Sequence, residues 1–196
     1  KRVQCTAISI GDMVANDEFT ELYISNSAGF CIIQATLTDA ALSAGLTLAD
    51  AAADQLNVSV LAGSGIQGNI DGPPADARFM APAGLAYIEA GSASTQCYQP
   101  NQCITDCCDP DCEGNAQLFV ADRAGSSIRR VNLGGNASDS DVRGNVSTYL
   151  GTVFGFRDSI SGTPDENDIL FAYPTGLRMS KIFNSDDAED ADDGSI

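Results

Sequence analysis

Short runs of alternating apolar and polar residues recur along the chain, and small polar or glycine-containing turns separate them. A two-residue period of this kind is the pattern of β-strands. It predicts two groups of four strands, followed by a ninth strand near Met179–Phe183. The first group comprises Ala7–Ile10, Leu22–Ser25, Cys31–Leu37 and Val58–Ala62, and the second comprises Gly84–Ile88, Leu118–Ala121, Ile128–Leu133 and Ser147–Leu150.

The two groups of strands repeat each other in sequence. Residues 21–29 (ELYISNSAG) align without gaps with residues 117–125 (QLFVADRAG), and each segment is typical of a β-hairpin. Residues 58–63 resemble residues 146–151 in the same way. The motif Phe-x-x-Pro-x-Gly-Leu occurs at 79–85 and again at 171–177. Four short strands per repeat predict one blade of a β-propeller.

The sequence therefore predicts an all-β chain that forms a partial propeller, with two four-stranded blades and the first strand of a third. Repeat one spans residues 5–63, repeat two spans 82–151, and repeat three begins at 174–183. A closed propeller needs at least four blades. We therefore expect the ring to be completed by a longer chain or by other subunits.

Three insertions interrupt this pattern. Residues 38–55 are rich in alanine and predict one or two short helices, with a buried side made of Leu42, Leu46, Leu48 and Leu56. Residues 91–115 contain five cysteines and form a cysteine-rich insertion in repeat two. Residues 184–194 form an acidic loop after the first strand of repeat three.

The repeated pattern resembles the NHL-repeat β-propellers. It consists of LAGxGxxGxxDG at 61–72, ARFxxPxGLA at 77–86, LFVAD at 118–122 and IRRV at 128–131. Repeat one departs from it, because Ser25-Asn26 replaces the Ala-Asp pair and Ile33-Gln34 replaces the two arginines. The resemblance implies a propeller fold that serves most often as a binding platform. The zinc-dependent lyases among related propellers need histidines, which this chain lacks.

Composition excludes several classes of function. The chain has 196 residues with 27 acidic and 10 basic side chains, a formal net charge of −17, and no histidine. Such a charge repels phosphate backbones, so no nucleic-acid partner is expected. Without histidine, no Ser-His-Asp or Cys-His relay and no imidazole-bound zinc site can form. The apolar runs are also far shorter than the roughly 20 residues that span a bilayer.

The seven cysteines favour an oxidising compartment. The five in the insertion, Cys97, Cys103, Cys107, Cys108 and Cys112, are consistent with a metal knuckle or with a disulfide-rich loop. We favour disulfides, because the insertion has no C-x2-C pair and the adjacent cysteines are typical of extracellular loops. Pairing of Cys5 with Cys31 is preferred; in the alternative, one of them bonds elsewhere. The odd cysteine then predicts a bond to another chain or to a further segment.

Three N-x-S/T sequons also favour an exported glycoprotein. They begin at Asn57, Asn136 and Asn145. Asn57 and Asn145 occupy equivalent positions just before the last strand of successive repeats. The sequence therefore predicts N-linked glycans and an extracellular, secreted or cell-surface location.

Three further patterns have both a functional and a structural interpretation. Gly63-x-Gly65-x-x-Gly68 matches a dinucleotide fingerprint, but Pro73-Pro74 follows instead of a helix, which favours turn glycines. Asp122 with Arg129 and Arg130 is either an ionic site or, as we favour, a turn cap with an arginine packed across the hairpin.

Calcium is the remaining candidate ligand. The acidic residues of the last loop and of the cysteine-rich insertion are hard oxygen ligands, but their spacing is not that of an EF-hand. They are Asp186, Asp187, Asp190 and Asp192, with Asp106, Asp109, Asp111 and Glu113. We favour a solvated acidic loop, with no bound metal or cofactor, over a weak Ca²⁺ site.

Three functions remain open from the sequence. We favour a non-catalytic structural or interaction module in an extracellular matrix, surface coat or filament, whose partners are other subunits or the rest of a longer chain. The second is a calcium-dependent, lactonase-like hydrolase, for which no carboxylate and asparagine set is identifiable. The third is a lectin-like or receptor-binding ectodomain, which the few scattered aromatic residues support weakly.

Overall fold

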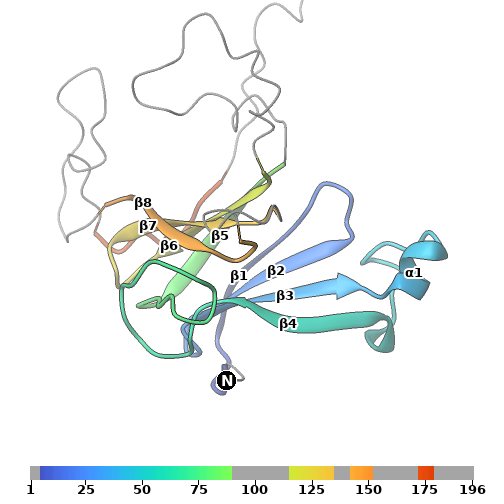
Figure 1. Ribbon diagram of the computed structural model, residues 1–196, viewed down its shortest axis with the longest axis horizontal. Helices are drawn as coiled ribbons and strands as arrows, with labels where there is room; N and C mark the ends of the chain where they lie inside the picture. Colours follow the sequence, from blue (N-terminus) through green and yellow to red (C-terminus); the bar gives the residue numbers. More distant parts are fainter. Residues whose placement is uncertain (1–4, 90–114, 135–141, 152–171, 179–196) are drawn as a thin grey trace, which may run out of the picture.

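The computed structural model describes residues 5–89, 115–134, 142–151 and 172–178. This part of the chain forms two four-stranded antiparallel sheets, each with its strands in chain order (Figure 1). The first sheet comprises β1 (Ile10–Ala15), β2 (Glu21–Asn26), β3 (Cys31–Leu37) and β4 (Leu56–Ala62). The second comprises β5 (Pro82–Ile88), β6 (Gln117–Asp122), β7 (Ser127–Asn132) and β8 (Val146–Leu150).

The two sheets have the same register, strand for strand. Met13 lies opposite Ile24 in the first sheet, and Leu85 lies opposite Val120 in the second. The register shifts also fall at matching places, between Ile10 and Met13 and between Pro82 and Leu85, and again at the start of β3 and of β7. The sequence alignment of residues 21–29 with 117–125 therefore matches the pairing of the strands.

The first strand lies later in the chain than the sequence pattern predicts. We expected it near Ala7–Ile10, but β1 spans Ile10–Ala15. The N–H of Ser9 donates to the Asn26 side chain at 2.9 Å instead of entering the sheet. Repeat one lacks the Pro-x-Gly-Leu motif that marks β5, so nothing in the sequence shows where this strand begins. The other seven predicted strands of the two repeats overlap the observed ones, and the predicted ninth strand lies outside the described residues.

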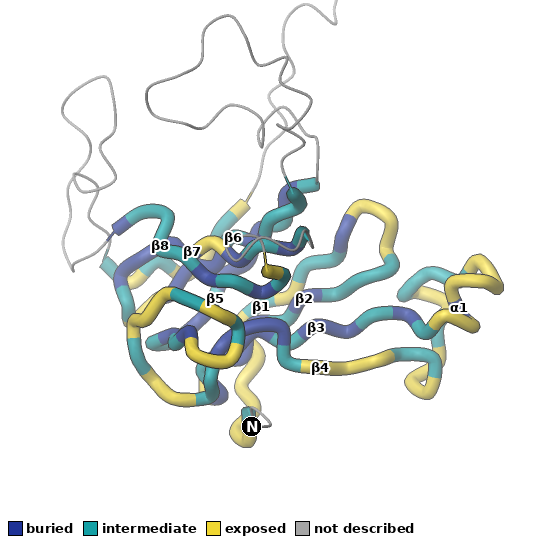
Figure 2. The backbone as a smooth tube through the Cα atoms, in the orientation of Figure 1, coloured by how far each residue is buried: buried dark blue, intermediate teal, exposed yellow. Residues whose placement is uncertain are grey.

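The hydrophobic core lies where the two sheets pack face to face, and Figure 2 shows the buried residues gathered there. The first sheet contributes Tyr23, Ile32, Leu61 and Ala62; the loop between the sheets contributes Ala77 and Phe79; the second sheet and its margin contribute Leu85, Leu118, Val120, Val131, Leu133 and Val146. Burial of these side chains is the main term that favours association of the sheets.

The alanine-rich insertion forms a short helix, α1 (Asp39–Ser43), and a 3-10 turn at Ala53–Gln55, at the far end of the first sheet (Figure 1). The Thr38 hydroxyl caps α1 by accepting the N–H of Ala41. The prediction that Leu42 is buried was wrong, because it is 47% exposed while Ala41 is 1% exposed. A helix of five residues has little more than one turn, so a single small residue covers the sheet.

A disulfide joins Cys5 to Cys31, which confirms the preferred pairing, and the two Cα atoms lie 6.5 Å apart. It ties the segment before β1 to the first residue of β3 and so fixes the start of the first sheet. The other five cysteines, Cys97, Cys103, Cys107, Cys108 and Cys112, lie outside the described residues.

Candidate functional site

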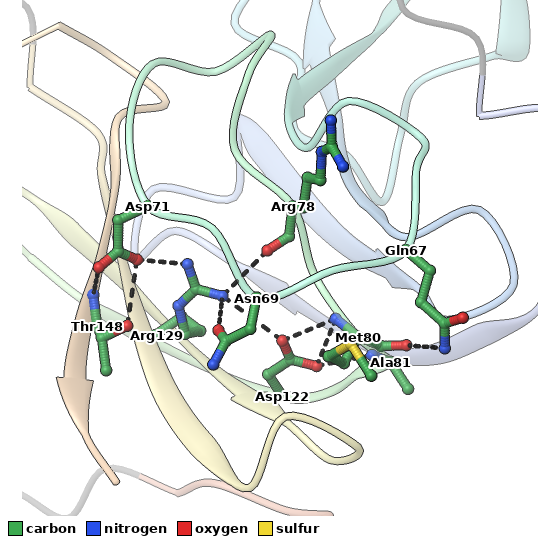
Figure 3. A network of polar contacts seen from close by, with 9 residues as sticks. All are labelled: Gln67, Asn69, Asp71, Arg78, Met80, Ala81, Asp122, Arg129 and Thr148. Atoms are coloured by element: carbon green, nitrogen blue, oxygen red, sulfur yellow. Dashed lines mark hydrogen bonds and ion pairs between the residues drawn. The ribbon is translucent and has the colours of Figure 1, made fainter. Parts of the chain in front are cut away.

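Two of the polar residues singled out by the sequence, Asp122 and Arg129, meet at the loop that connects the two sheets, residues 63–81 (Figure 3). The third, Arg130, is exposed and donates to the Ser147 hydroxyl at 3.2 Å. No helix begins in this loop, so its glycines cannot present a helix N-terminus to a pyrophosphate. Gly63 and Gly65 have φ values of 102° and 76°, a backbone conformation that favours glycine. This supports their interpretation as turn residues.

Arg129 of β7 holds this loop against the second sheet. Its side chain is completely buried. One guanidinium nitrogen donates to Asn69 Oδ1 at 2.7 Å and to the Arg78 carbonyl oxygen at 3.1 Å, and the other donates to the Asp71 carboxylate (Figure 3). The guanidinium also lies over the Phe79 ring, 5.4 Å from its centre, which adds a cation–π contact.

Asp122, at the end of β6, is the buried anion beside this arginine. Its carboxylate accepts the N–H groups of Met80 at 2.9 Å and Ala81 at 2.7 Å, and lies 3.6 Å from Arg129. Burial raises the pKa of Asp122, and the N–H groups of Ala81 and Met80 together with Arg129 oppose that rise. Asp122 thus fixes the end of the connecting loop as well as its own turn.

Asp71 fastens the middle of the loop to β8. Its carboxylate accepts the N–H of Thr148 at 3.0 Å and the Thr148 hydroxyl at 3.2 Å. Next to it, Gly72 and Val146 exchange two backbone hydrogen bonds of 2.9 Å. The loop is therefore an added edge of the second sheet. We call Asn69, Asp71, Arg78, Asp122 and Arg129 the Arg129 cluster.

Polar contacts also join β5 to the first sheet. The hydroxyls of Ser25 and Ser27 donate to the carbonyl oxygens of Ala83 and Pro82. The Asp12 carboxylate accepts the N–H of Leu85 at 2.9 Å. These bonds satisfy backbone groups of β5 that would otherwise be buried without partners.

A further group of contacts, centred on Tyr23, lies at the interface between the two sheets. The Tyr23 and Tyr87 rings stack with their centres 5.9 Å apart, and the Tyr23 hydroxyl donates to the Glu21 carboxylate. Arg143 donates to Glu21 at 2.8 Å and to the Tyr23 oxygen at 3.3 Å. Burial, followed by the hydrogen bond to Glu21, raises the pKa of Tyr23, so the phenol stays protonated.

The charged groups of these contacts join the connecting loop and the two sheets to one another. The Arg129 cluster fills the space between the loop and the sheet, and its buried cation and anion are bonded to neighbouring groups. Among the described residues, no three His, Cys, Asp or Glu side chains lie together in a way that would hold a metal ion. The described helices are also too short and polar to cross a membrane.

Two of the three predicted glycosylation sites lie on or next to the last strand of a sheet. Asn57 is exposed in β4, and Asn145 is partly exposed just before β8. The third sequon, at Asn136, lies outside the described residues, as do Asp186, Asp187, Asp190 and Asp192 of the acidic loop.

No protein-family model and no curated protein matches the sequence. Two solved structures share its fold. They are auxiliary nutrient binding proteins from Bacteroides ovatus (16% identity, TM-score 0.56) and Bacteroides thetaiotaomicron (14% identity, TM-score 0.57). Each match covers 86% of this chain and 32% of the other protein. This chain therefore spans about a third of the length of the proteins it resembles, and at this identity the likeness concerns the fold alone.

Sequence reasoning found Asp122 and Arg129 but missed several of their partners and the groups that join the sheets. Asp71 was part of the repeat motif, yet the arginine that it binds is 58 residues away. Asp12 and Arg143 carried no motif, and Glu21 belonged to the aligned hairpin without being singled out. Only the way in which the two sheets pack against each other would have indicated that these residues meet.

Proposed function

We propose that this chain is a non-catalytic interaction module of NHL-type β-propeller blades, exposed outside the cell as part of a matrix, surface coat or filament. Its partners are other protein subunits or further blades of a longer chain. The proposal rests first on the way in which the sheets repeat, and second on the bonding of the charged residues.

The observation that carries the proposal is a close backbone contact that occurs twice, once between β1 and β5 and once between β5 and residues 175–177. A Cβ added at Gly11 of β1 would lie 3.0 Å from the Ala83 Cα of β5, and a Cβ added at Gly84 of β5 would lie 2.6 Å from the Gly176 Cα. Residues 172–178 thus pack on β5 much as β5 packs on β1. A segment that follows β5 as β5 follows β1 is expected between successive blades of a propeller.

The bonding of the charged groups supports a role in binding instead of catalysis. A general acid or base needs a titratable group within reach of a substrate, but Arg129 and Asp122 are fully buried and bonded to each other and to the connecting loop. Two of the solved structures of similar fold are also named as binding proteins. A calcium-dependent hydrolase and a lectin-like or receptor-binding ectodomain remain the alternatives.

Metal analysis combined with activity assays tests the absence of catalysis. We expect the purified protein to contain less than stoichiometric calcium and zinc, and to hydrolyse aryl esters and lactones no faster than a heat-denatured sample. Hydrolysis that EDTA abolishes and calcium restores would instead establish the enzyme alternative.

The sequons predict that expression through a secretory pathway adds glycans to Asn57 and Asn145. Asn57→Gln and Asn145→Gln are each expected to remove one glycan mass, because both side chains are accessible beside an outermost strand. Intact-mass analysis before and after glycosidase treatment measures this. Ser59→Thr is the matched control, since it keeps the sequon and should keep the glycan on Asn57. An unchanged mass in all variants would remove this support for an extracellular location.

A further inference from the structure

The last strand of the first sheet has one edge that no described segment pairs with. β4 stands at the end of the strand order and pairs with β3 on one side only (Figure 1). Val58, near the middle of β4, is 67% exposed, and Figure 2 shows exposed residues along this part of the strand. Such an edge presents unpaired backbone N–H and C=O groups, onto which an extended peptide can add as a further strand.

The equivalent edge of the second sheet is covered. The common register of the two sheets places Val58 of β4 where β8 has Val146. There, Gly72 of the connecting loop exchanges two backbone hydrogen bonds of 2.9 Å with Val146. The same edge therefore carries an added extended segment in the second sheet, and among the described residues it carries none in the first.

The backbone groups of Val58 are oriented to accept such a segment. In antiparallel sheets, the N–H and C=O groups of successive residues point alternately toward the two neighbouring strands. Val146 directs both of its groups away from β7 and toward the loop. The matching register directs both groups of Val58 away from β3, and no described residue outside the sheet bonds to them.

The side chains around this edge differ between the two sheets, and the difference indicates which peptide fits. In the second sheet, Asp71 of the loop bonds to Arg129 and Thr148. In the first sheet, Ile33 and Val60 pair with each other at those same two positions. They offer neither a cation nor a hydroxyl, so a carboxylate would lie there without a counter-ion in a chain of net charge −17. The position favours an uncharged, aliphatic side chain.

We propose that the edge of β4 binds an extended, uncharged segment of a further blade, which pairs through its backbone with Val58 as Gly72 pairs with Val146. An aliphatic residue precedes the glycine of this segment, in place of Asp71, and packs against the apolar side chains of β3 and β4. The partner is a blade because the segment that covers β8 is itself the connection between two sheets, from β4 to β5. The inference rests on the proposed function and deepens it by stating what the partner contributes.

NMR titration of the ¹⁵N-labelled chain with synthetic peptides tests this pairing. The probe has the sequence of residues 66–74 (IQGNIDGPP) with valine in place of Asp71. We expect it to shift the amide resonances of Val58 and Val60, with a Kd at or below about 1 mM. The unchanged sequence, which keeps the aspartate, should bind about threefold more weakly or worse, because its carboxylate meets only apolar side chains.

Two substitutions at Val58 separate backbone pairing from side-chain contact. Val58→Pro removes the N–H donor and should abolish the shifts at peptide concentrations up to about 2 mM. Proline is tolerated on an edge strand whose N–H faces solvent, and circular dichroism with thermal melts confirms that the variant is folded. Val58→Thr is the matched control, since it keeps the N–H and a β-branched side chain, and its Kd should stay within about twofold of the wild-type value.

A double variant tests the chemistry of the partner independently. Ile33→Arg with Val60→Thr gives the first sheet the side chains that hold the loop in the second, and should reverse the preference in favour of the aspartate peptide. This reversal decides the matter if Val58→Pro does not fold.

The outcomes that overturn the pairing are distinct from those that overturn the proposed function. Wild-type protein whose β4 amides do not shift with about 2 mM valine peptide contradicts the pairing, as do shifts that persist in folded Val58→Pro. Equal affinity for the two peptides contradicts the aliphatic residue assigned to the partner. Each of these results removes only this edge contact, whereas calcium-dependent hydrolysis would remove the proposed function itself.

Discussion

Arg129→Ala is expected to lower the free energy of unfolding by about 3–5 kcal/mol, the usual cost of removing one partner of a buried ion pair. The guanidinium is completely buried between the connecting loop and the second sheet. Its loss leaves the buried Asp122 carboxylate without a nearby cation, and leaves Asn69 and the Arg78 carbonyl without their donor. Urea unfolding followed by circular dichroism measures the change.

The adjacent arginine provides a matched control. Arg130 is exposed and donates one hydrogen bond to the Ser147 hydroxyl at 3.2 Å, so Arg130→Ala should change stability by no more than about 0.5 kcal/mol. Equal effects of the two substitutions would show that burial of the Arg129 cluster does not contribute to stability as described.

Gly63→Ala is expected to lower the free energy of unfolding by about 2–5 kcal/mol, from backbone strain and steric overlap together. Gly63 has a φ of 102° where β4 enters the connecting loop. A Cβ at this position would lie 2.6 Å from the Phe30 carbonyl oxygen and 2.8 Å from the Cys31 Cα. These are backbone atoms at the start of β3, which the Cys5–Cys31 disulfide holds in place. Thermal unfolding and urea titration measure the loss.

Gly45→Ala separates strain from overlap. Gly45 also has a positive φ, of 71°, but a Cβ there meets no atom within 4 Å. Its replacement should therefore cost only the strain of about 1–2 kcal/mol. If Gly63→Ala costs no more than Gly45→Ala, the close packing of the loop against β3 is contradicted.

The sequence predicted most of the fold because local patterns determine most of it. Alternating apolar residues located seven of the eight described strands, and the gap-free alignment of two hairpins gave the repeat. The start of β1 was missed because its motif is absent, and Leu42 was misassigned because the helix is too short to have a buried stripe. Both errors concern short elements whose position depends on contacts with distant residues.

The site was predicted less completely, because its contacts join residues far apart in the chain. Asp122 and Arg129 were found, but the bond from Arg129 to Asp71 spans 58 residues, and the bond from Arg143 to Glu21 spans 122. Alternation likewise shows that β2 and β3 have two faces, but not which face a second sheet covers. The contacts of Tyr23 and Ser25 with the second sheet show which face is covered.

Whether Arg129 holds the connecting loop and the second sheet as one unit is tested most directly by native-state hydrogen exchange. In the wild-type protein, the amides of Gly72, Val146 and Thr148 should be protected, because each donates to a group across the boundary between loop and sheet. In Arg129→Ala these amides should lose protection together, while amides in the pairing of β2 with β3 keep theirs. Rapid exchange of the loop amides in the wild type, or unchanged protection in Arg129→Ala, would contradict the role assigned to Arg129.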